Sequence, residues 1–205
     1  LLSYTERYVL DDKEINEEDL IELLTGVEKT LGDDNATLFE ILTCAFLKHA
    51  ENFKDNVNII EAGLFHQFDS TNVFKENLMT LIGVIHNDHF QWLENKSIEG
   101  VIYEKTAKLL NSNIFINKQV NNEIRDKIEK SLEKNTSNKY FFGKDFNIAK
   151  SENGFIQYQD QLGELVLPEP SILGDHQLYN ISTSIAASRK IFNLNDEYIK
   201  NGIKN

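Results

Sequence analysis

Residues 79–85 read Met79-Thr80-Leu81-Ile82-Gly83-Val84-Ile85, an almost unbroken apolar run. A run of this kind predicts a strand that is buried on both faces, as in a parallel sheet. Ile114-Phe115-Ile116 predicts the next strand, and the pattern from Ser97 to Lys108 predicts a helix between the two. Strands that alternate with helices indicate an α/β fold with an open, mostly parallel sheet flanked by helices.

Upstream of this run, two helices and a short strand are predicted. Asn16 precedes three acidic residues, which is typical of a helix start, and the apolar spacing that follows ends at Gly32. A second helix is expected from about Thr37 to His49. Val57-Asn58-Ile59-Ile60 predicts a short strand that leads directly into Glu61.

Downstream, the pattern continues with a helix, a hairpin and a long last helix. The helix has apolar residues at helical spacing, namely Val120, Ile124, Ile128 and Leu132. Phe155–Tyr158 and Leu165–Leu167, joined through Asp160 and Gly163, predict a small β-hairpin. The last helix is expected over about Gln177 to Phe192.

Composition limits the function classes. With 205 residues and 40% hydrophobic content, the chain can bury one sizeable core, so we expect one domain with at most a small appendage. A formal net charge of −12 argues against general binding to nucleic acid or to a membrane surface. No apolar run is long enough to span a bilayer, and the single cysteine, Cys44, favours a reducing, cytoplasmic compartment.

Three clusters of polar residues are candidates for chemistry. Glu61 is expected at the end of a strand, where α/β sheets bind ligands, and its carboxylate suits magnesium; the alternative is a helix cap or a solvated acid. His89 follows the strand that ends at Ile85, and could serve a metal or phosphate site or be purely structural. Glu104-Lys105 lies in a helix, where a solvated ion pair is the alternative.

Taken in order, these segments resemble folylpolyglutamate synthases and dihydrofolate synthases of the Mur ligase superfamily. Thr37-Leu38-Phe39-Glu40-Ile41-Leu42-Thr43 is similar to the family's T-x-F-E-x-L-T helix. Further matching segments are Ser3-Tyr4-Thr5-Glu6-Arg7, Glu61-Ala62-Gly63-Leu64, Asp69-Ser70-Thr71-Asn72-Val73, Asn87-Asp88-His89, Tyr103-Glu104-Lys105 and Leu173-Gly174-Asp175-His176-Gln177-Leu178-Tyr179-Asn180.

The resemblance implies a role for each matching residue. Glu61, His89 and Lys105, the last as a carbamate, should bind Mg²⁺ and act in catalysis. Asn180 should hydrogen-bond the adenine of ATP. Thr37, Phe39 and Asp69 should line the pterin pocket, where a ring stacks and a carboxylate accepts hydrogen bonds.

The implied enzyme is an ATP-dependent amide ligase of folate biosynthesis. It would add L-glutamate to dihydropteroate, or to the glutamyl tail of a folate, through an acyl phosphate, and we expect a monomer. Two alternatives stay open: a ligase acting on peptidoglycan precursors, and a degenerate, non-catalytic nucleotide-binding module. Asp69-Ser70-Thr71-Asn72 and Gln177 favour the folate branch.

The sequence also departs from the family pattern. Phe65-His66-Gln67 replaces Gly-Gly-Arg, which makes the loop bulkier and removes a cation; His66 either restores part of the lost polar contact or is solvated. Thr106-Ala107-Lys108 replaces Ala-Gly-Ile and adds a second lysine near Lys105.

The resemblance further implies a fragment. The family's G-T-N-G-K-G-S phosphate loop would precede Leu1, and its C-terminal domain would follow Asn205. We therefore expect residues 1–194 to be a partial central ATP-binding domain and residues 195–205 to begin a linker. Without the phosphate loop, this piece alone should be inactive.

Overall fold

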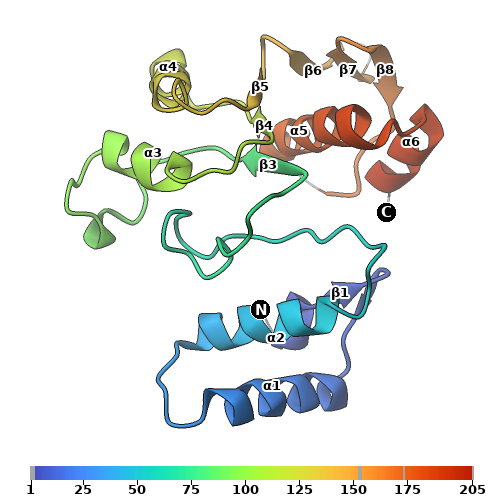
Figure 1. Ribbon diagram of the computed structural model, residues 1–205. Helices are drawn as coiled ribbons and strands as arrows, with labels where there is room; N and C mark the ends of the chain where they lie inside the picture. The colour runs from blue at the N-terminus through green and yellow to red at the C-terminus, as the bar shows by residue number, and fades with distance from the viewer. Residues whose placement is uncertain (1–2, 152–153, 173, 205) are drawn as a thin grey trace. The chain divides into compact units, whose positions relative to one another are not determined.

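The protein is described from a computed structural model that covers residues 3–151, 154–172 and 174–204. Its internal contacts divide it into two compact units, Leu1–Val73 and Phe74–Asn205 (Figure 1). Leu1-Leu2 and Leu173, the first residue of a family-like segment, lie outside the described residues.

The first unit is a helical pair with a small ribbon. A 3₁₀ turn, η1 (Thr5–Arg7), precedes β1 (Val9–Leu10) and β2 (Lys13–Glu14), which pair antiparallel. Helices α1 (Glu17–Leu31) and α2 (Leu38–Ala50) follow and pack against each other. Both predicted helices are confirmed.

The ends of these two helices lie where the local sequence placed them. The Asn16 side chain accepts a hydrogen bond from the Asp19 backbone N–H at 2.8 Å and so caps α1. Gly32, with a φ of 61°, ends α1 in a conformation that favours glycine. Thr37 and Glu40 form a reciprocal capping box at the start of α2.

A buried tyrosine joins the ribbon to α2. Tyr8 is 2% exposed, stacks on Phe46 with ring centroids 5.8 Å apart, and donates its hydroxyl to the Leu42 carbonyl oxygen at 2.6 Å. The cluster around it is small: Ile15, Leu20, Leu42 and Ala45, with Leu23, Leu24, Val27 and Phe46 at its margin. The hydrogen bond satisfies the buried hydroxyl, so that the ring adds apolar contact without a polar penalty.

The second unit contains the predicted parallel sheet. Strand β4 (Asn113–Ile116) lies between β3 (Met79–Ile82) and β5 (Asn138–Phe141), and both pairings are parallel. The connections between them contain α3 (Ile98–Thr106) and α4 (Asn122–Ser131), because parallel neighbours require a crossover. The α/β fold class and its parallel sheet are confirmed.

The central strand of this sheet is buried on both faces. Ile114, Phe115 and Ile116 are each at most 1% exposed, although neighbouring residues of a strand point to opposite faces. Phe115 belongs to the cluster formed with α5 (Asp175–Phe192), which packs against β3, β4 and β6. Helices α3 and α4 pack on each other.

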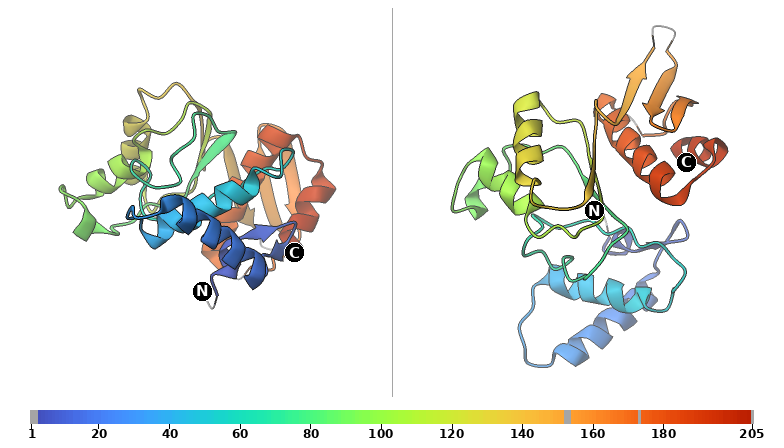
Figure 2. Two further views of the ribbon diagram at one scale, coloured as in Figure 1. Left: turned by 60° about the horizontal axis from the view of Figure 1, so that its bottom comes forward. Right: turned by 45° about the horizontal axis from the view of Figure 1, so that its top comes forward.

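A second, antiparallel sheet completes this unit (Figure 2). Strands β6 (Phe146–Lys150), β7 (Ile156–Asp160) and β8 (Gly163–Leu167) form it in that order, next to α5 and α6 (Asp196–Lys204). The hairpin predicted from the sequence is β7–β8 and is confirmed. Strands β5 and β6 were not predicted; β5 mixes apolar with polar residues without a clear period, and the alternation of Phe146, Asn147 and Ile148 in β6 was missed.

Two strand predictions were wrong. Residues 57–60 form no strand and have no ladder partner among the described residues; Ile59 is 93% exposed. The strand expected over residues 79–85 ends at Ile82, and Leu81 is 46% exposed, so it is not buried on both faces. Beyond Ile82 the Gln119 side chain, not a backbone neighbour, bonds Gly83 and Ile85.

Candidate functional site

In the first unit, the segment that follows α2 carries Glu61 and Asp69. Glu61 is exposed and follows residues 57–60, which pair with no strand among the described residues; this corrects the expectation that it ends a buried strand. Its carboxylate is therefore presented to solvent from an irregular segment. This exposure leaves it available for an ion or a substrate.

Asp69 organises the loop after Glu61. Its Oδ2 accepts hydrogen bonds from the backbone N–H groups of Gly63 and Leu64 at 2.9 and 3.3 Å. Its Oδ1 accepts from the backbone N–H and the hydroxyl of Thr71 at 3.0 and 2.6 Å. A carboxylate that accepts four such bonds fixes the loop backbone, and most of its acceptor capacity is already used.

Thr37 and Phe39 lie at the start of α2, and Phe39 contacts this loop. The Thr37 hydroxyl is engaged in the capping box with Glu40. The Phe39 ring instead lies against Gly63 so closely that a Cβ there would come within 2.7 Å of it and within 3.1 Å of Asp69. A larger residue at this position would force the ring to move, and the ring, the glycine and the aspartate form one local assembly.

The loop residues that depart from the family pattern are partly buried. Phe65, His66 and Gln67 each have intermediate exposure, so His66 is not a fully solvated loop residue. The backbone carbonyl oxygens of His66 and Gln67 accept hydrogen bonds from the Asp69 N–H and the Asn72 side chain. The bulkier residues are thus part of the folded loop.

In the second unit, His89 and Lys105 lie on segments that follow β3. His89 is exposed, has a left-handed backbone with a φ of 64°, and precedes the 3₁₀ turn η2 (Phe90–Trp92). Lys105 is half-buried in the last turn of α3. Burial lowers the pKa of Lys105, and the negative charge of nearby Asp88 opposes part of that shift.

A network of amide side chains lies at the carboxyl end of β4, where α/β sheets place their ligands. Asn117 is 4% exposed, and its Nδ2 donates to the Asn180 Oδ1 at 2.7 Å. The Asn180 Nδ2 donates in turn to the Gln177 Oε1 at 2.9 Å. Both Asn180 and Gln177 lie in the first turns of α5.

The next pair of residues strengthens the same junction. Lys118 donates its Nζ to the Tyr179 hydroxyl at 2.7 Å and lies 4.0 Å from the centre of that ring. Two consecutive residues after β4 thus hold two consecutive residues of α5. Gln119, 7% exposed, bonds back to Ile85 and to the Asn117 carbonyl oxygen.

Sequence reasoning identified Asn180 but missed Asn117 and Gln119. The signal was present: two amide residues come directly after the buried strand Ile114–Ile116 and are separated by one residue. Polar side chains at this place are typical of a ligand-binding sheet edge. The Asn180 partner of Asn117 and the Ile85 partner of Gln119 lie more than 30 positions away and could not be inferred from spacing.

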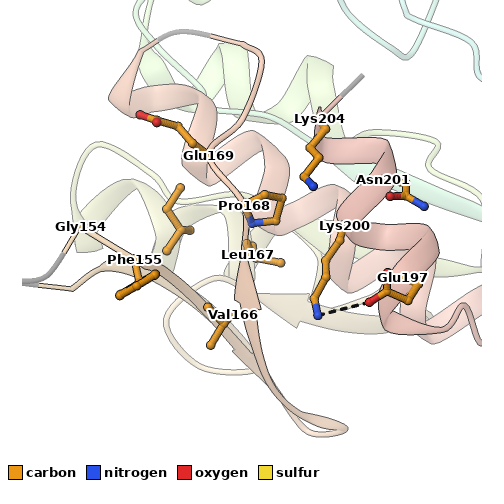
Figure 3. A pocket seen from close by; sticks show the side chains of 11 residues that line it. Gly154, Phe155, Val166, Leu167, Pro168, Glu169, Glu197, Lys200, Asn201 and Lys204 are labelled. Atoms are coloured by element: carbon orange, nitrogen blue, oxygen red, sulfur yellow. Dashed lines mark ion pairs between the residues drawn. The ribbon is translucent and has the colours of Figure 1, made fainter.

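The second unit also has an open cavity of about 600 Å³ between β7–β8 and α6 (Figure 3). An apolar wall that includes Phe155, Val166 and Leu167 faces Lys200 and Lys204, and Glu169 and Glu197 also line it. The Lys200 Nζ lies 3.6 Å from the Glu197 Oε1. None of the residues predicted for the site lies in this cavity, and its charges balance.

The predicted metal ligands fall in both units: Glu61 in the first, and His89 and Lys105 in the second. Within residues 3–151, 154–172 and 174–204, no group of three or more His, Cys, Asp and Glu side chains is placed to hold a metal ion. In the same part of the chain, no helix is long and apolar enough to cross a membrane.

Comparison with known proteins relates this chain to two curated sequences. It is 26% identical over 175 residues to the "Probable dihydrofolate synthetase" of Schizosaccharomyces pombe, with 83% of this chain covered. It is 29% identical over 179 residues to the dihydrofolate synthase/folylpolyglutamate synthase of Bacillus subtilis, with 82% covered. The alignments span 41% of each relative's length. No family model matches the sequence.

Solved structures show the same fold. The apo form of L. casei FPGS superposes with a TM-score of 0.83 at 21% identity and covers 98% of this chain and 52% of its own. E. coli FolC in complex with DHPP and ADP gives 0.85 at 23% identity, covering 98% and 47%. The Yersinia pestis bifunctional enzyme, complexed with AMPPNP and Mn ion, gives 0.83 at 24% identity, covering 98% and 47%. In sequence and in fold, therefore, this chain resembles the dihydrofolate synthases and folylpolyglutamate synthases, as its motifs indicated.

Proposed function

We propose that the full-length protein is an ATP-dependent ligase that adds L-glutamate to dihydropteroate or to the glutamyl tail of a folate. The observation that carries this proposal is the sequence similarity to enzymes with these names over 82–83% of the chain. Residues 1–194 would then be part of the central ATP-binding domain. The ADP, DHPP and AMPPNP found in structures of the same fold support a nucleotide and a pterin as ligands.

The reaction requires activation of a carboxylate. The carboxylate oxygen attacks the γ-phosphorus of ATP, the bond to the β-γ bridging oxygen breaks, and an acyl phosphate and ADP result. The amine of L-glutamate then attacks the acyl carbon, loses a proton and expels inorganic phosphate, leaving an amide. Bound magnesium would neutralise the phosphoryl oxygens during the transfer.

We propose Glu61, His89 and a carbamylated Lys105 as the residues that hold magnesium. Hard cations prefer oxygen ligands, and a carbamate turns a repelled ammonium into a carboxylate-like ligand. Carbamylation joins the neutral amine to CO₂ and releases one proton. The chemistry of Lys105 fits, because burial lowers its pKa and so enlarges the neutral fraction at any pH below the ordinary value of 10.5.

The residues that we propose to bind the substrates come from both units. Asn180 is exposed and keeps one N–H and one lone pair beyond its two observed hydrogen bonds, which suits the edge of adenine. In the first unit Phe39 is the group we propose to stack on the pterin. Asp69 would act there mainly by shaping the loop and Thr37 by capping α2, since their polar atoms are already bonded.

A substrate assay on the full-length protein tests this proposal. The protein is given ATP, magnesium and L-glutamate with dihydropteroate, with a folate, or with a muropeptide acceptor, and phosphate release is measured. We expect release with a pterin substrate only. Release with the muropeptide alone would assign the protein to peptidoglycan synthesis, and no release with any acceptor would indicate a non-catalytic module.

A further inference from the structure

The amide chain at the end of β4 has a fixed direction. The Asn117 Oδ1 accepts the backbone N–H of Lys118 at 2.7 Å, and a backbone N–H can only donate. The Asn117 amino group must therefore face Asn180, where it donates at 2.7 Å. Since an amino group cannot accept, Asn180 has to present its oxygen to Asn117 and its Nδ2 to the other side, toward Gln177.

Asn117 itself has little freedom to change this direction. It is 4% exposed, its backbone N–H donates to the Ile82 carbonyl oxygen at 2.9 Å, and its own carbonyl oxygen accepts from the Gln119 Nε2 at 2.8 Å. An asparagine side chain in water turns over easily, because its two ends have similar size. Here, rotation would break the bond from the Lys118 N–H and place an oxygen against the Asn180 oxygen.

We infer that Asn117 is a positioning residue that makes the nucleotide site selective for adenine over guanine, by fixing the direction of the Asn180 amide. This inference rests on the proposed adenine contact of Asn180. At position 6 of the purine, adenine carries an amino donor and guanine carries an oxygen acceptor. The neighbouring N1 is an acceptor in adenine and carries a donor N–H in guanine, so that turning the Asn180 amide over would exchange the preferred base.

The Asn117→Asp variant should turn the chain over. An aspartate keeps the bond from the Lys118 N–H but has no donor, so that Asn180 would turn its amino group toward residue 117 and its oxygen toward Gln177. Gln177 is partly exposed and can rotate to donate. A matched asparagine–base pair contributes about 1–3 kcal/mol of discrimination. We therefore expect the ratio of the GTP to the ATP dissociation constant to fall about tenfold.

Two further variants control this experiment. Asn117→Ala removes the constraint without adding charge, and should lower the same ratio by about threefold, a smaller change because the freed amide still adopts the adenine-binding direction part of the time. Asn121→Asp adds the same charge four positions along. Aspartate also caps helices well, so α4 should start normally and the ratio should stay at the wild-type value.

Calorimetric titration of the full-length variants with ATP and with GTP, together with thermal unfolding to confirm folding, decides between the outcomes. If Asn180→Ala leaves the ATP/GTP preference unchanged, the adenine contact within the proposed function is wrong. If Asn180→Ala abolishes the preference while Asn117→Asp and Asn117→Ala match Asn121→Asp, the adenine contact stands and the role of Asn117 is overturned. A change in Asn117→Asp that disappears in the Asn180→Ala background supports the inference.

Discussion

The loop around Asp69 in the first unit and the end of β4 in the second unit use polar side chains in opposite ways. The Asp69 carboxylate accepts four hydrogen bonds from backbone and hydroxyl groups of its own loop. Asn180 is held by one amide on each side and keeps one donor and one acceptor toward solvent. In the loop, Asp69 holds the backbone in place. At the sheet edge, Asn180 instead presents its remaining donor and acceptor to solvent, where a ligand can bind.

This difference changes how a motif match should be interpreted. Asp69 and Thr37 match family positions expected to touch a pterin, yet their polar atoms are engaged within the first unit. Glu61, whose side chain has no hydrogen bond or ion pair among the described residues, is exposed and available. A residue type in a motif predicts importance, and only its hydrogen-bond partners separate a structural from a ligand-binding role.

The largest effect is expected from Glu61→Gln. The amide keeps the size of the side chain but removes the charge that a divalent cation requires, so kcat in the full-length enzyme should fall about a hundredfold, or about 2.7 kcal/mol. Thermal unfolding should not change, because Glu61 is exposed. Glu22→Gln, at another exposed acid of this unit, is the matched control. A kcat within about threefold of wild type would make Glu61 a surface acid.

The next effect is expected from Lys105→Ala. Loss of the carbamate should lower kcat about fiftyfold, roughly 2.3 kcal/mol, and a short carboxylic acid added to the solution should restore part of the activity. Because the pKa of Lys105 is lowered, the neutral amine increases as pH rises toward that pKa, and with it the carbamate, which ¹³CO₂ labelling can measure by NMR. Lys108→Ala, at the exposed lysine nearby, should keep full activity. Normal activity of Lys105→Ala would make Lys105 an ordinary charged residue of α3, without a role in catalysis.

A local effect is expected from Asp69→Ala. Hydrogen bonds to a charged group contribute about 2 kcal/mol, so the loop should open about thirtyfold more often. The amides of Gly63, Leu64 and Thr71 would report this by faster hydrogen exchange. Asp55→Ala, at an exposed acid of the same unit, should leave these rates unchanged. Unchanged exchange in Asp69→Ala would mean that Phe39 and Gly63 hold the loop without it.

The smallest effect is expected from Thr37→Ala. Removing a capping threonine costs about 1 kcal/mol of helix stability, which urea unfolding can measure, while Thr37→Ser should be nearly neutral. Pterin affinity in the full-length enzyme should change little, because the Thr37 hydroxyl is engaged with Glu40 at the start of α2. A large loss of pterin affinity with normal stability would show that the Thr37 hydroxyl contacts the substrate.

Much of the fold was predictable because its signals are local. Helix α1 runs from an asparagine cap to a glycine end, α2 starts in a capping box, and the β7–β8 turn lies between alternating strands. The wrong predictions involve partners. Residues 57–60 have a strand-like composition but no neighbouring strand among the described residues, and a strand without a ladder leaves its backbone to solvent.

For the candidate site, the sequence by itself determined which residue types are present and in what order: Glu61, His89, Lys105 and Asn180, each on a recognisable segment. Only the tertiary structure decided what each one can do. The fold engages Asp69 in hydrogen bonds of its own loop, and it partly buries Lys105, which lowers the pKa of that lysine. It also brings Asn117 against Asn180, which is 63 positions away in the chain. Charge type is a property of the residue, but burial and hydrogen-bond direction depend on neighbours that are distant in sequence, and so they appear only once the chain has folded.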